Sequence, residues 1–346
     1  TVSVANAQWT TLSSGVTSEL RSVYFVDENT GWAVGLGGTI IHTNNGGQSW
    51  SQQVSGTSTI LNDVCFVNAT TGFVVGGAGI ILKTTNGGTN WNPLSTGTTE
   101  ALRSVYFVNA NIGYAVGGYT GGGVIFKTTD GGTNWVAQTS NSTQWLQSVY
   151  FTDANNGYAV GGESVGGRVV KTTDGGANWT MQSIPTNYAM NSVYFSNSLA
   201  GVAVGNSGKI LKTSNGGSSW IEQNNTTSGV LYSVTFAPKG TLGVGFATGW
   251  NGRILKSTDG GANWYSQTSG TTRTLYSVFF VNDSIGYVVG ENGVVLKTSN
   301  AGGVGIEEKK PSDIIQSVFP NPFNDIITIE ISDYFESEIS VYTLDG

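Results

Sequence analysis

Residues that commonly carry catalysis or bind metals are scarce in this sequence. The chain contains 1 His and 1 Cys, which are His42 and Cys65. A transition-metal site or a His-based triad needs partners that are absent, so composition excludes both. Cys65 replaces a Tyr in an apolar strand pattern, which favours a buried and unreactive thiol. We therefore expect no metal and no cofactor.

Carboxylates offer no better basis for catalysis. A glycosidase needs two of them facing one cleft, about 5 to 9.5 Å apart. The acidic residues in the variable loops described below belong to different repeats and form no evident pair: Glu19, Glu100, Glu163 and Glu291. We predict that the protein is not an enzyme, and glycoside hydrolysis is kept as an alternative.

Residue types suited to binding are more informative. Arg forms forked hydrogen bonds to carboxylates or carbonyls, and aromatic rings pack against proteins or stack on sugars. Such residues vary between repeats at positions expected to share one surface: Arg21, Arg103, Trp145, Tyr232, Trp250 and Tyr276. We predict that they bind a macromolecule, either a protein or a surface glycan. The alternative is a ring that is polar only because it is exposed, with both tryptophans covering loop glycines.

A repeated turn organises the elements that must position these residues. The phrase Thr85-Asn-Gly-Gly-Thr-Asn-Trp91 recurs, with variations, at five other places, for example Thr129-Asp-Gly-Gly-Thr-Asn-Trp135. Asn or Asp can accept hydrogen bonds from nearby backbone N–H groups, and Gly tolerates positive φ. The phrase therefore predicts a tight turn that the following Trp fixes to the layer beneath.

Short strand phrases precede each turn. Ser22-Val-Tyr-Phe25 and Gly31-Trp-Ala-Val-Gly35 have relatives in later repeats, and a third strand such as Ile80-Ile-Leu-Lys-Thr84 follows. A fourth strand begins at the Trp. Four short strands per repeat of roughly 40 residues predict a β-propeller blade. One slot of the third strand holds a basic residue throughout, and we expect an aliphatic stem along the sheet with its ammonium in water: His42, Lys83, Lys127, Lys171, Lys212, Lys256 and Lys297.

Counting predicts seven blades. The first-strand Val and the Trp each occur seven times, but the last repeat has no Trp and Trp9 has no turn before it. The count closes only if the strand Gln8–Leu12 completes the blade that begins near Leu275. Such closure leaves no open sheet edge. We predict an all-β fold in which residues 8–303 form a seven-bladed propeller closed by the N-terminal strand.

Loop lengths predict one regular face and one variable face. The distance from each Val to the next Trp is 27 residues in repeats 1, 2 and 5 and 30 in repeats 3, 4 and 6. We place the extra residues between the second and third strands, at 118–123, 162–167 and 246–252. These loops share a face with the loops that lead into the first strands, opposite the Gly-Gly turns. Binding residues are therefore expected on the variable face.

Charge narrows the class of partner. The net charge is −7 with a pI of about 4.7, so the basic surface needed for nucleic-acid binding is missing. No apolar run approaches the roughly 20 residues of a membrane span. We expect neither nucleic acid nor a membrane span.

The turn phrase resembles the Asp-box of BNR-repeat propellers, and the full repeat resembles those of photosystem II assembly and stability factors. The resemblance covers residues 8–303 and implies the fold, with the Asp-box positions structural: Asn45, Asn86, Asp130, Asp174, Asn215 and Asp259. Sialidase-like propellers share the turn, but the arginine triad and catalytic residues of that family are not matched. A photosystem-type assembly factor is an alternative function.

The C-terminal segment resembles a different family. After a predicted linker at 304–312, Val318-Phe-Pro-Asn-Pro-Phe323 and the alternating Ile327, Ile329 and Ile331 resemble a type IX secretion C-terminal sorting domain of Bacteroidetes. We interpret residues 313–346 as part of such a β-sandwich-like domain; an ordinary β-sandwich is the alternative. The resemblance implies recognition by the type IX machinery and a secreted, extracellular or outer cell-surface location, which argues against a photosystem role. Self-assembly into a surface layer is a further possibility.

Overall fold

The computed structural model describes residues 8–163, 166–225, 227–237, 243–303, 315–319 and 328–331. Contacts divide the chain into two compact units, Ala7–Gly302 and a second containing the C-terminal segment. In the second unit, β29 (Ile315–Phe319) and β30 (Thr328–Ile331) form an antiparallel hairpin. The rest of the predicted sorting-domain segment at 313–346 and the predicted linker at 304–312 lie outside the described residues.

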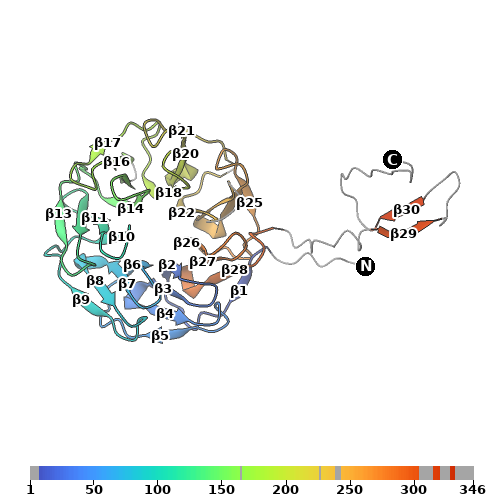
Figure 1. The fold of residues 1–346 in the computed structure, drawn as a ribbon, viewed down its shortest axis with the longest axis horizontal. Helices are drawn as coiled ribbons and strands as arrows, with labels where there is room; N and C mark the ends of the chain where they lie inside the picture. Colours follow the sequence, from blue (N-terminus) through green and yellow to red (C-terminus); the bar gives the residue numbers. More distant parts are fainter. Residues whose placement is uncertain are drawn as a thin grey trace, which may run out of the picture. The chain divides into compact units, whose positions relative to one another are not determined.

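The first unit is a ring of seven four-stranded antiparallel sheets, which confirms the predicted seven-bladed propeller (Figure 1). The innermost strands of blades 1 to 7 are β2 (Leu20–Phe25), β6 (Leu61–Phe66), β10 (Leu102–Phe107), β14 (Leu146–Phe151), β18 (Met190–Phe195), β22 (Leu231–Phe236) and β26 (Leu275–Phe280). The second strands are β3 (Gly31–Gly35), β7 (Gly72–Gly76), β11 (Gly113–Gly117), β15 (Gly157–Gly161), β19 (Gly201–Gly205), β23 (Gly245–Gly249) and β27 (Gly286–Gly290).

The outer half of each blade is shorter. The third strands are β4 (Ile40–Thr43), β8 (Ile81–Thr84), β12 (Val124–Thr128), β16 (Arg168–Thr172), β20 (Ile210–Thr213), β24 (Ile254–Ser257) and β28 (Val295–Thr298). The outer strands are β5 (Ser51–Gln53), β9 (Asn92–Leu94), β13 (Val136–Gln138), β17 (Thr180–Met181), β21 (Ile221–Glu222) and β25 (Tyr265–Gln267), with β1 (Thr10–Leu12) in blade 7. Short 3-10 turns join second and third strands in five blades: η1 (Leu36–Gly38), η2 (Gly77–Gly79), η3 (Asn206–Gly208), η4 (Trp250–Gly252) and η5 (Glu291–Gly293).

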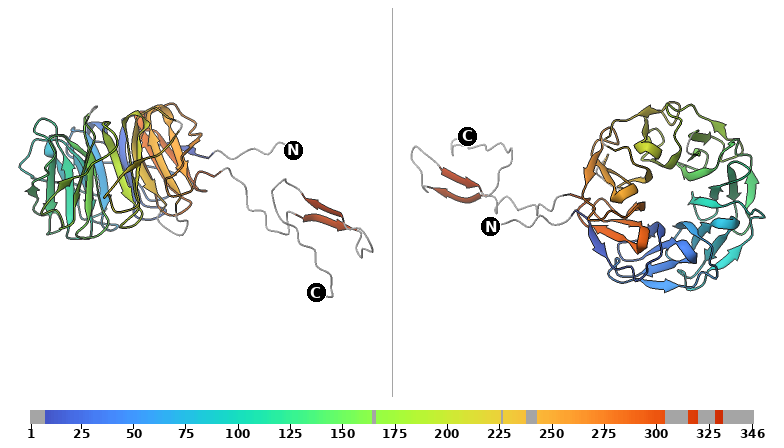
Figure 2. Two further views of the ribbon diagram at one scale, coloured as in Figure 1. Left: turned by 90° about the horizontal axis from the view of Figure 1, so that it is seen from above. Right: turned by 180° about the vertical axis from the view of Figure 1, so that it is seen from behind.

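The N-terminal strand closes the ring as predicted. Blade 7 has the order β1-β28-β27-β26, with Thr10 opposite Lys297 and Leu12 opposite Val295. Just before this strand, Trp9 is 3% exposed and packs edge-on against Phe246 of blade 6 and Phe280 of blade 7. Figure 2 shows the blue start of the ring beside the orange-red strands of blade 7. Closure therefore combines backbone pairing with a buried aromatic anchor.

Hydrophobic cores lie between neighbouring blades. The core between blades 1 and 2 joins Trp32 and Ile40 of the first with Leu61, Phe66 and Trp91 of the second. There Trp32 stacks on Phe66 at 3.6 Å between ring centroids, and Trp91 meets the same Phe66 edge-on. Six further clusters repeat this arrangement around the ring. Each blade is therefore stabilised mainly through its two neighbours.

The Asp-box turns have the predicted hydrogen bonds. Asp130 Oδ1 accepts from the backbone N–H groups of Thr133 and Asn134, both at 2.9 Å. The hydroxyl of Thr128 accepts from Gly132 N at 2.9 Å, and Gly131 and Gly132 have φ of 68° and 80°. These positive values explain the Gly-Gly pair. The other predicted positions make equivalent bonds: Asn45, Asn86, Asp174, Asn215 and Asp259.

The expectation that the repeated Lys ammonium groups lie in water is wrong. Lys83, Lys127, Lys171 and Lys297 each donate to a glycine carbonyl in the Asp-box of the next blade, at 2.6–2.9 Å. Where the second strand carries Tyr, the phenol donates to the same carbonyl as the Lys. For example, Tyr114 Oη donates to Gly175 O at 2.7 Å. A hydrogen bond from an ammonium to a carbonyl is charge-assisted and therefore stronger than a neutral one. The Lys slot therefore links adjacent blades.

One predicted insertion is misplaced. In blade 6 the turn η4 and strand β24 align with their counterparts in blade 1 without extra residues. The connection between β22 and β23 is instead the longer one, with 8 residues against 5 between β2 and β3, and its residues 238–242 lie outside the described residues. The second-strand phrase here is Gly245-Phe-Ala-Thr-Gly249, in which Thr248 replaces the usual Val and obscures the repeat. In blades 3 and 4 the extra residues lie between second and third strands, as predicted.

We expect the Asp-box carboxylates to make stability depend on acid. Hydrogen bonds from the backbone and side chain of Asn134 lower the pKa of Asp130 from 3.8 to about 2, and Asn178 does the same for Asp174. A lowered folded-state pKa adds stability that is complete above pH 4 or so and is lost as the pH falls toward 2. The melting temperature should therefore fall between about pH 4 and pH 2.

A paired variant isolates this effect. Blades 1 and 2 already carry Asn at the same position, so Asp130→Asn/Asp174→Asn should fold normally. Its melting temperature, followed by circular dichroism, should fall less steeply between pH 4 and pH 2 than that of the wild type. Identical slopes would assign the acid sensitivity to other groups.

Candidate functional site

A β-bulge recurs at the start of every innermost strand. The register with the second strand shifts between Leu20 and Ser22 in blade 1, and at the equivalent residues of the other six blades. In a regular strand, consecutive side chains point to opposite sides, but a bulge lets two neighbours share one side. Arg21 and Ser22 therefore both reach the central channel.

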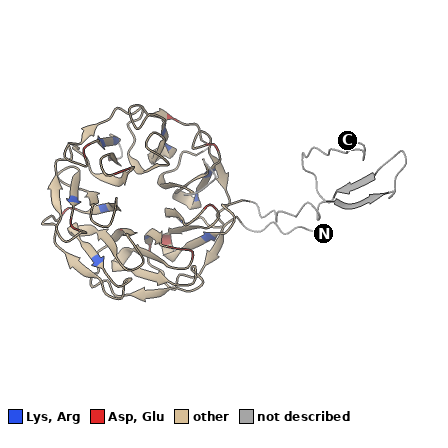
Figure 3. Ribbon diagram, viewed as in Figure 1, with Lys and Arg blue, Asp and Glu red and all other residues tan. Residues whose placement is uncertain are grey.

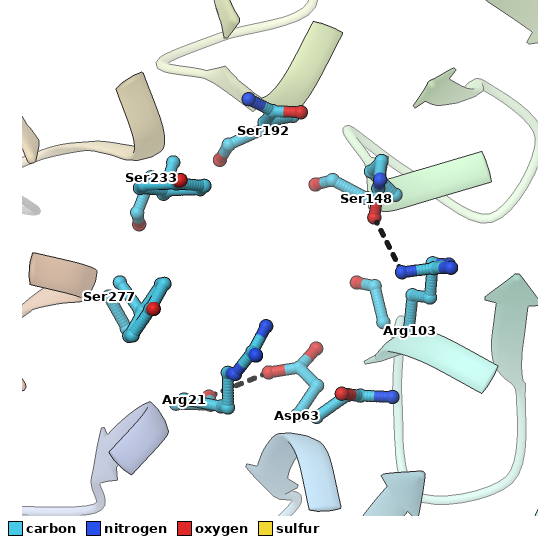
Figure 4. Close-up of a pocket in the computed structure, with 14 residues that line it drawn as sticks. Arg21, Asp63, Arg103, Ser148, Ser192, Ser233 and Ser277 are labelled. Atoms are coloured by element: carbon cyan, nitrogen blue, oxygen red, sulfur yellow. Dashed lines mark hydrogen bonds between the residues drawn. The ribbon is translucent and has the colours of Figure 1, made fainter. Parts of the chain in front are cut away.

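This geometry builds a pocket of about 220 Å³ at the channel mouth (Figure 4). Each blade contributes two consecutive residues. The outer residue varies, and we call this set the mouth ring: Arg21, Asn62, Arg103, Gln147, Asn191, Tyr232 and Tyr276. The inner residue is Ser in six blades and Asp63 in blade 2, and we call this set the serine ring: Ser22, Asp63, Ser104, Ser148, Ser192, Ser233 and Ser277.

The serine ring holds neighbouring blades together. Each of its oxygens accepts a hydrogen bond from the Val N–H of the next blade, so Ser22 Oγ accepts from Val64 N at 3.4 Å and Ser148 Oγ from Val193 N at 3.4 Å. The series continues around the whole circle. This ring is therefore structural. Two residues of the mouth ring add to it, because Asn62 Nδ2 donates to Leu102 O and Asn191 Nδ2 donates to Leu231 O of the next blade, each at 2.8 Å.

Two residues after the serine ring, the innermost strands carry aromatic residues that pack on one another and form a belt. Tyr24 packs on Phe279 at 4.9 Å between centroids, and Tyr150 lies between Tyr106 and Tyr194 at 5.1 and 5.0 Å. Burial raises the pKa of Tyr106 to about 12, so its phenol stays neutral under physiological conditions. None of these rings lines the mouth pocket. The polar pocket therefore opens on the variable face, above this aromatic belt.

Asp63 is a site residue that the sequence did not single out. Its carboxylate accepts from Ser22 Oγ at 2.7 Å and from the backbone N–H of Val64 and Val105, each at 2.9 Å. Burial raises its pKa above the ordinary value despite these bonds. Asp63 thus joins neighbouring blades as the serines do, and it places a carboxylate beneath the mouth ring.

Arg21 is largely occupied by its own neighbours. Its guanidinium forms an ion pair with Glu19, whose other oxygen accepts from Tyr276 Oη at 3.1 Å. The guanidinium also lies over the Tyr276 ring at 4.6 Å, and Tyr276 packs on Tyr232 at 5.1 Å. These contacts form one cluster on blades 1, 6 and 7. The charge of Arg21 is therefore partly neutralised.

Arg103 has no such neutralising partner. Within the described residues, the ion pairs are Arg21–Glu19 and Lys209–Glu222, so no carboxylate pairs with Arg103. Its guanidinium reaches only Gln147 Oε1, at 3.5 Å, and its Nε is buried without a hydrogen-bond partner. Burial, and then the charge of Arg21, lower the pKa of Arg103. The blade 3 side of the mouth therefore carries an uncompensated cation.

Trp145 extends this site outward from Arg103. The Arg103 guanidinium lies 4.9 Å from the Trp145 ring, which in turn stacks on Tyr119 at 5.6 Å with an interplanar angle of 6°. Tyr119 is 63% exposed and belongs to the lengthened loop of blade 3, which Thr120 anchors to Glu100. The indole Nε1 of Trp145 is buried without a partner among the described residues. Tyr119 was missed, although the loop insertion marked its position.

The six predicted binding residues divide into two places. Arg21, Arg103, Tyr232 and Tyr276 line the mouth pocket, and Trp145 contacts Arg103 beside it. Trp250 lies on the same face but lines a separate groove. The four glutamates considered for catalysis have other partners. Glu19 pairs with Arg21, Glu100 accepts from Thr120 in the blade 3 loop, and Glu291 accepts from Thr274 N at 2.9 Å. Glu163 N donates to Gln144 Oε1 at 3.1 Å.

The repeats are shared with a known family. A family model described as photosynthesis system II assembly factor YCF48 matches residues 2–150, 139–236 and 221–299. The chain belongs to the YCF48 family. Among curated proteins, none matches its sequence.

Solved structures show where else this fold occurs. A structure titled "YCF48 bound to D1 peptide" is similar with TM-score 0.69 and 22% identity, covering 87% of this chain and 99% of that one. YCF48 from Cyanidioschyzon merolae gives TM-score 0.69 and 24% identity over 84% and 98%. An ancestral GH74 enzyme gives TM-score 0.67 and 18% identity, covering 83% of this chain but 46% of that one. At these identities the likeness shows the fold alone.

Two searches of the described residues bear on other site types. No group of three or more His, Cys, Asp or Glu is placed to hold a metal ion within them. Nor does that part of the chain contain a helix that is both long and apolar enough to cross a bilayer.

Proposed function

We propose that this propeller is a non-catalytic module that binds an acidic segment of a partner protein at the channel mouth. The observation that carries the proposal is Arg103, a half-buried guanidinium without a carboxylate partner in the described residues. A desolvated cation is costly unless an anion meets it. A carboxylate would accept from its fork of N–H donors.

The surroundings of Arg103 fit a peptide. Trp145 and Tyr119 provide a rigid apolar platform beside the charge, and Gln147 provides an amide group for a backbone. The related YCF48 structure is titled as bound to the D1 peptide, which supports a protein ligand for this fold family. Although the chain's net charge is −7, charged side chains are sparse on the ring, so the mouth arginines act locally (Figure 3).

The pocket is poorly equipped for hydrolysis. Among the 14 residues that line it, Asp63 is the one carboxylate, and it is engaged with Ser22 and the backbone. A glycosidase needs a second carboxylate in the same cleft. The likeness to a GH74 enzyme concerns the propeller frame and supplies no such pair. Binding therefore agrees better with the lining residues than catalysis does.

We also propose that the protein is exported, on the basis of the sequence at 318–346 and its resemblance to type IX sorting domains. Most of this segment lies outside the described residues. Fusion of residues 304–346 to a fluorescent reporter in a host with type IX secretion tests this. Reporter in the medium or on the cell surface would support export, and retention inside the cell would contradict it.

Peptide binding has a direct test. We expect the purified full chain to bind fluorescein-labelled acidic peptides in fluorescence anisotropy, and to bind amidated, carboxylate-free versions of the same lengths roughly tenfold more weakly. Because the contact is ionic, the affinity should fall as NaCl is raised from 50 to 500 mM. Equal affinity for acidic and neutral peptides, or no binding to either, would reject the proposal.

A further inference from the structure

A second depression lies on the variable face between blades 5 and 6. It has a volume of about 590 Å³ and shares none of its lining residues with the mouth pocket. Tyr188 borders it from the loop before β18, and Trp250 borders it from the turn after β23. We call this depression the blade 5–6 groove. Its occupant must therefore be considered separately from the peptide at the mouth.

Two exposed aromatic rings flank the groove. Trp250 is 59% exposed and Tyr188 is 43% exposed. Leu36, Asn206 and Glu291 occupy the position of Trp250 in blades 1, 5 and 7, so the repeat does not require an indole there. The ring rests on Gly229, where an added Cβ would lie 3.6 Å from Trp250 Cε3. Contact with the loop fixes one part of the indole and leaves the rest open for a ligand.

Hydroxyl and amide groups form the floor between these rings. Ser207, Thr227 and Ser228 line it, and the hydroxyls of Ser207 and Ser228 make no hydrogen bond to any described residue. No carboxylate lines the groove, and Arg253 is engaged with Ser266 Oγ at 3.3 Å. The floor therefore offers hydroxyl and amide groups beside the Arg253 guanidinium, and it lacks the acids that hydrolysis requires.

A polar trough continues past Trp250 toward blade 7. This neighbouring depression, about 640 Å³, shares Arg253 with the groove and is lined mainly by hydroxyl and amide residues such as Asn251, Ser266 and Thr268. A ligand longer than a single small molecule can thus follow the face from Tyr188 past the indole.

We propose that the blade 5–6 groove binds a neutral oligosaccharide. The C–H face of a pyranose ring packs on an indole or phenol, and its hydroxyls match the Ser and Thr groups of the floor. Nucleic acid is disfavoured by the net charge of −7. The proposal is independent of peptide binding, because no residue of the groove lines the mouth.

The test uses the full chain with four defined probes: cellohexaose, xylohexaose, mannohexaose and chitohexaose. Saturation-transfer NMR and calorimetry are expected to show binding to at least one of them. Trp250→Ala should weaken that binding roughly tenfold or more, and Tyr188→Ala should weaken it as well. Melting temperatures should stay unchanged, since both side chains are exposed.

Matched variants make the result specific. Tyr265 is 63% exposed on the outer strand β25 and lines neither depression, so Tyr265→Ala should leave the affinity within about twofold of the wild type. Arg103→Met should weaken peptide binding by roughly a hundredfold without affecting the oligosaccharide. Absence of binding to all four probes, or equal binding by wild type and Trp250→Ala, would overturn the proposal.

Discussion

Deletion of residues 1–12 is expected to lower the melting temperature of the propeller by roughly 10 °C or more. The deletion removes strand β1 and the 3%-exposed Trp9 from between blades 6 and 7. Loss of a buried Trp alone costs about 3–5 kcal/mol, a large part of the usual 5–15 kcal/mol of total stability. The freed edge of β28 would also expose unpaired backbone groups and favour association between chains.

Smaller changes separate the contribution of strand β1 pairing from that of the buried Trp9 side chain. Deletion of residues 1–7 leaves β1 and Trp9 in place and should not change the melting temperature measured by calorimetry. Trp9→Ala should cause most of the decrease in melting temperature. Thr10→Pro should disturb the pairing with Lys297 but keep the indole. If deletion of 1–12 left both the melting temperature and the monomeric state unchanged, the strand would not be needed for closure.

The second large effect is expected at Arg103. Arg103→Met should weaken binding of an acidic peptide by roughly a hundredfold, because a hydrogen-bonded charge pair contributes more than a neutral contact. Arg21→Met should cost less, since Glu19 already pairs with Arg21 in the free protein. The measurement is the anisotropy titration described above, together with a melting curve for each variant.

Two further variants sharpen the interpretation. Arg103→Lys keeps the charge but loses the planar fork, so its affinity should be intermediate. Asp63→Asn removes a negative charge from the same pocket and should strengthen binding a few fold. Equal losses in Arg21→Met and Arg103→Met would contradict the distinction between the two guanidiniums. Weaker binding by Asp63→Asn, with an unchanged melting temperature, would show that its carboxylate assists the ligand.

The repeats made the fold predictable from the sequence. Four strand phrases and a turn recur with constant order, and the missing Trp of the last repeat pointed to Trp9 as its replacement. The constant spacing before the first-strand Val also placed Arg21 and its equivalents on one shared surface. The strands and turns within each repeat could therefore be predicted from local sequence patterns.

Contacts between repeats could not be predicted in the same way. The ammonium of Lys127 meets a carbonyl 48 residues away, and no local pattern encodes that distance. The bulge that turns both Arg21 and Ser22 into the channel depends on pairing with Gly35 and Val34 across the blade. Asp63 was overlooked because it stands where most repeats carry Ser, and only the channel geometry shows its neighbours. Trp145 and Trp250 share a face, but the sequence did not show that Trp145 contacts Arg103 whereas Trp250 lines a separate groove.

The recurring bulge brings two adjacent residues of each blade to the channel, one in the serine ring and one in the mouth ring. In each blade a serine-ring residue joins neighbouring blades, and its immediate predecessor belongs to the mouth ring. Asn62 and Asn191 of the mouth ring also donate to the next blade, so a combinatorial library confined to the other five positions would vary the mouth on an unaltered frame. The same arrangement suits this propeller to serve as a non-antibody affinity scaffold.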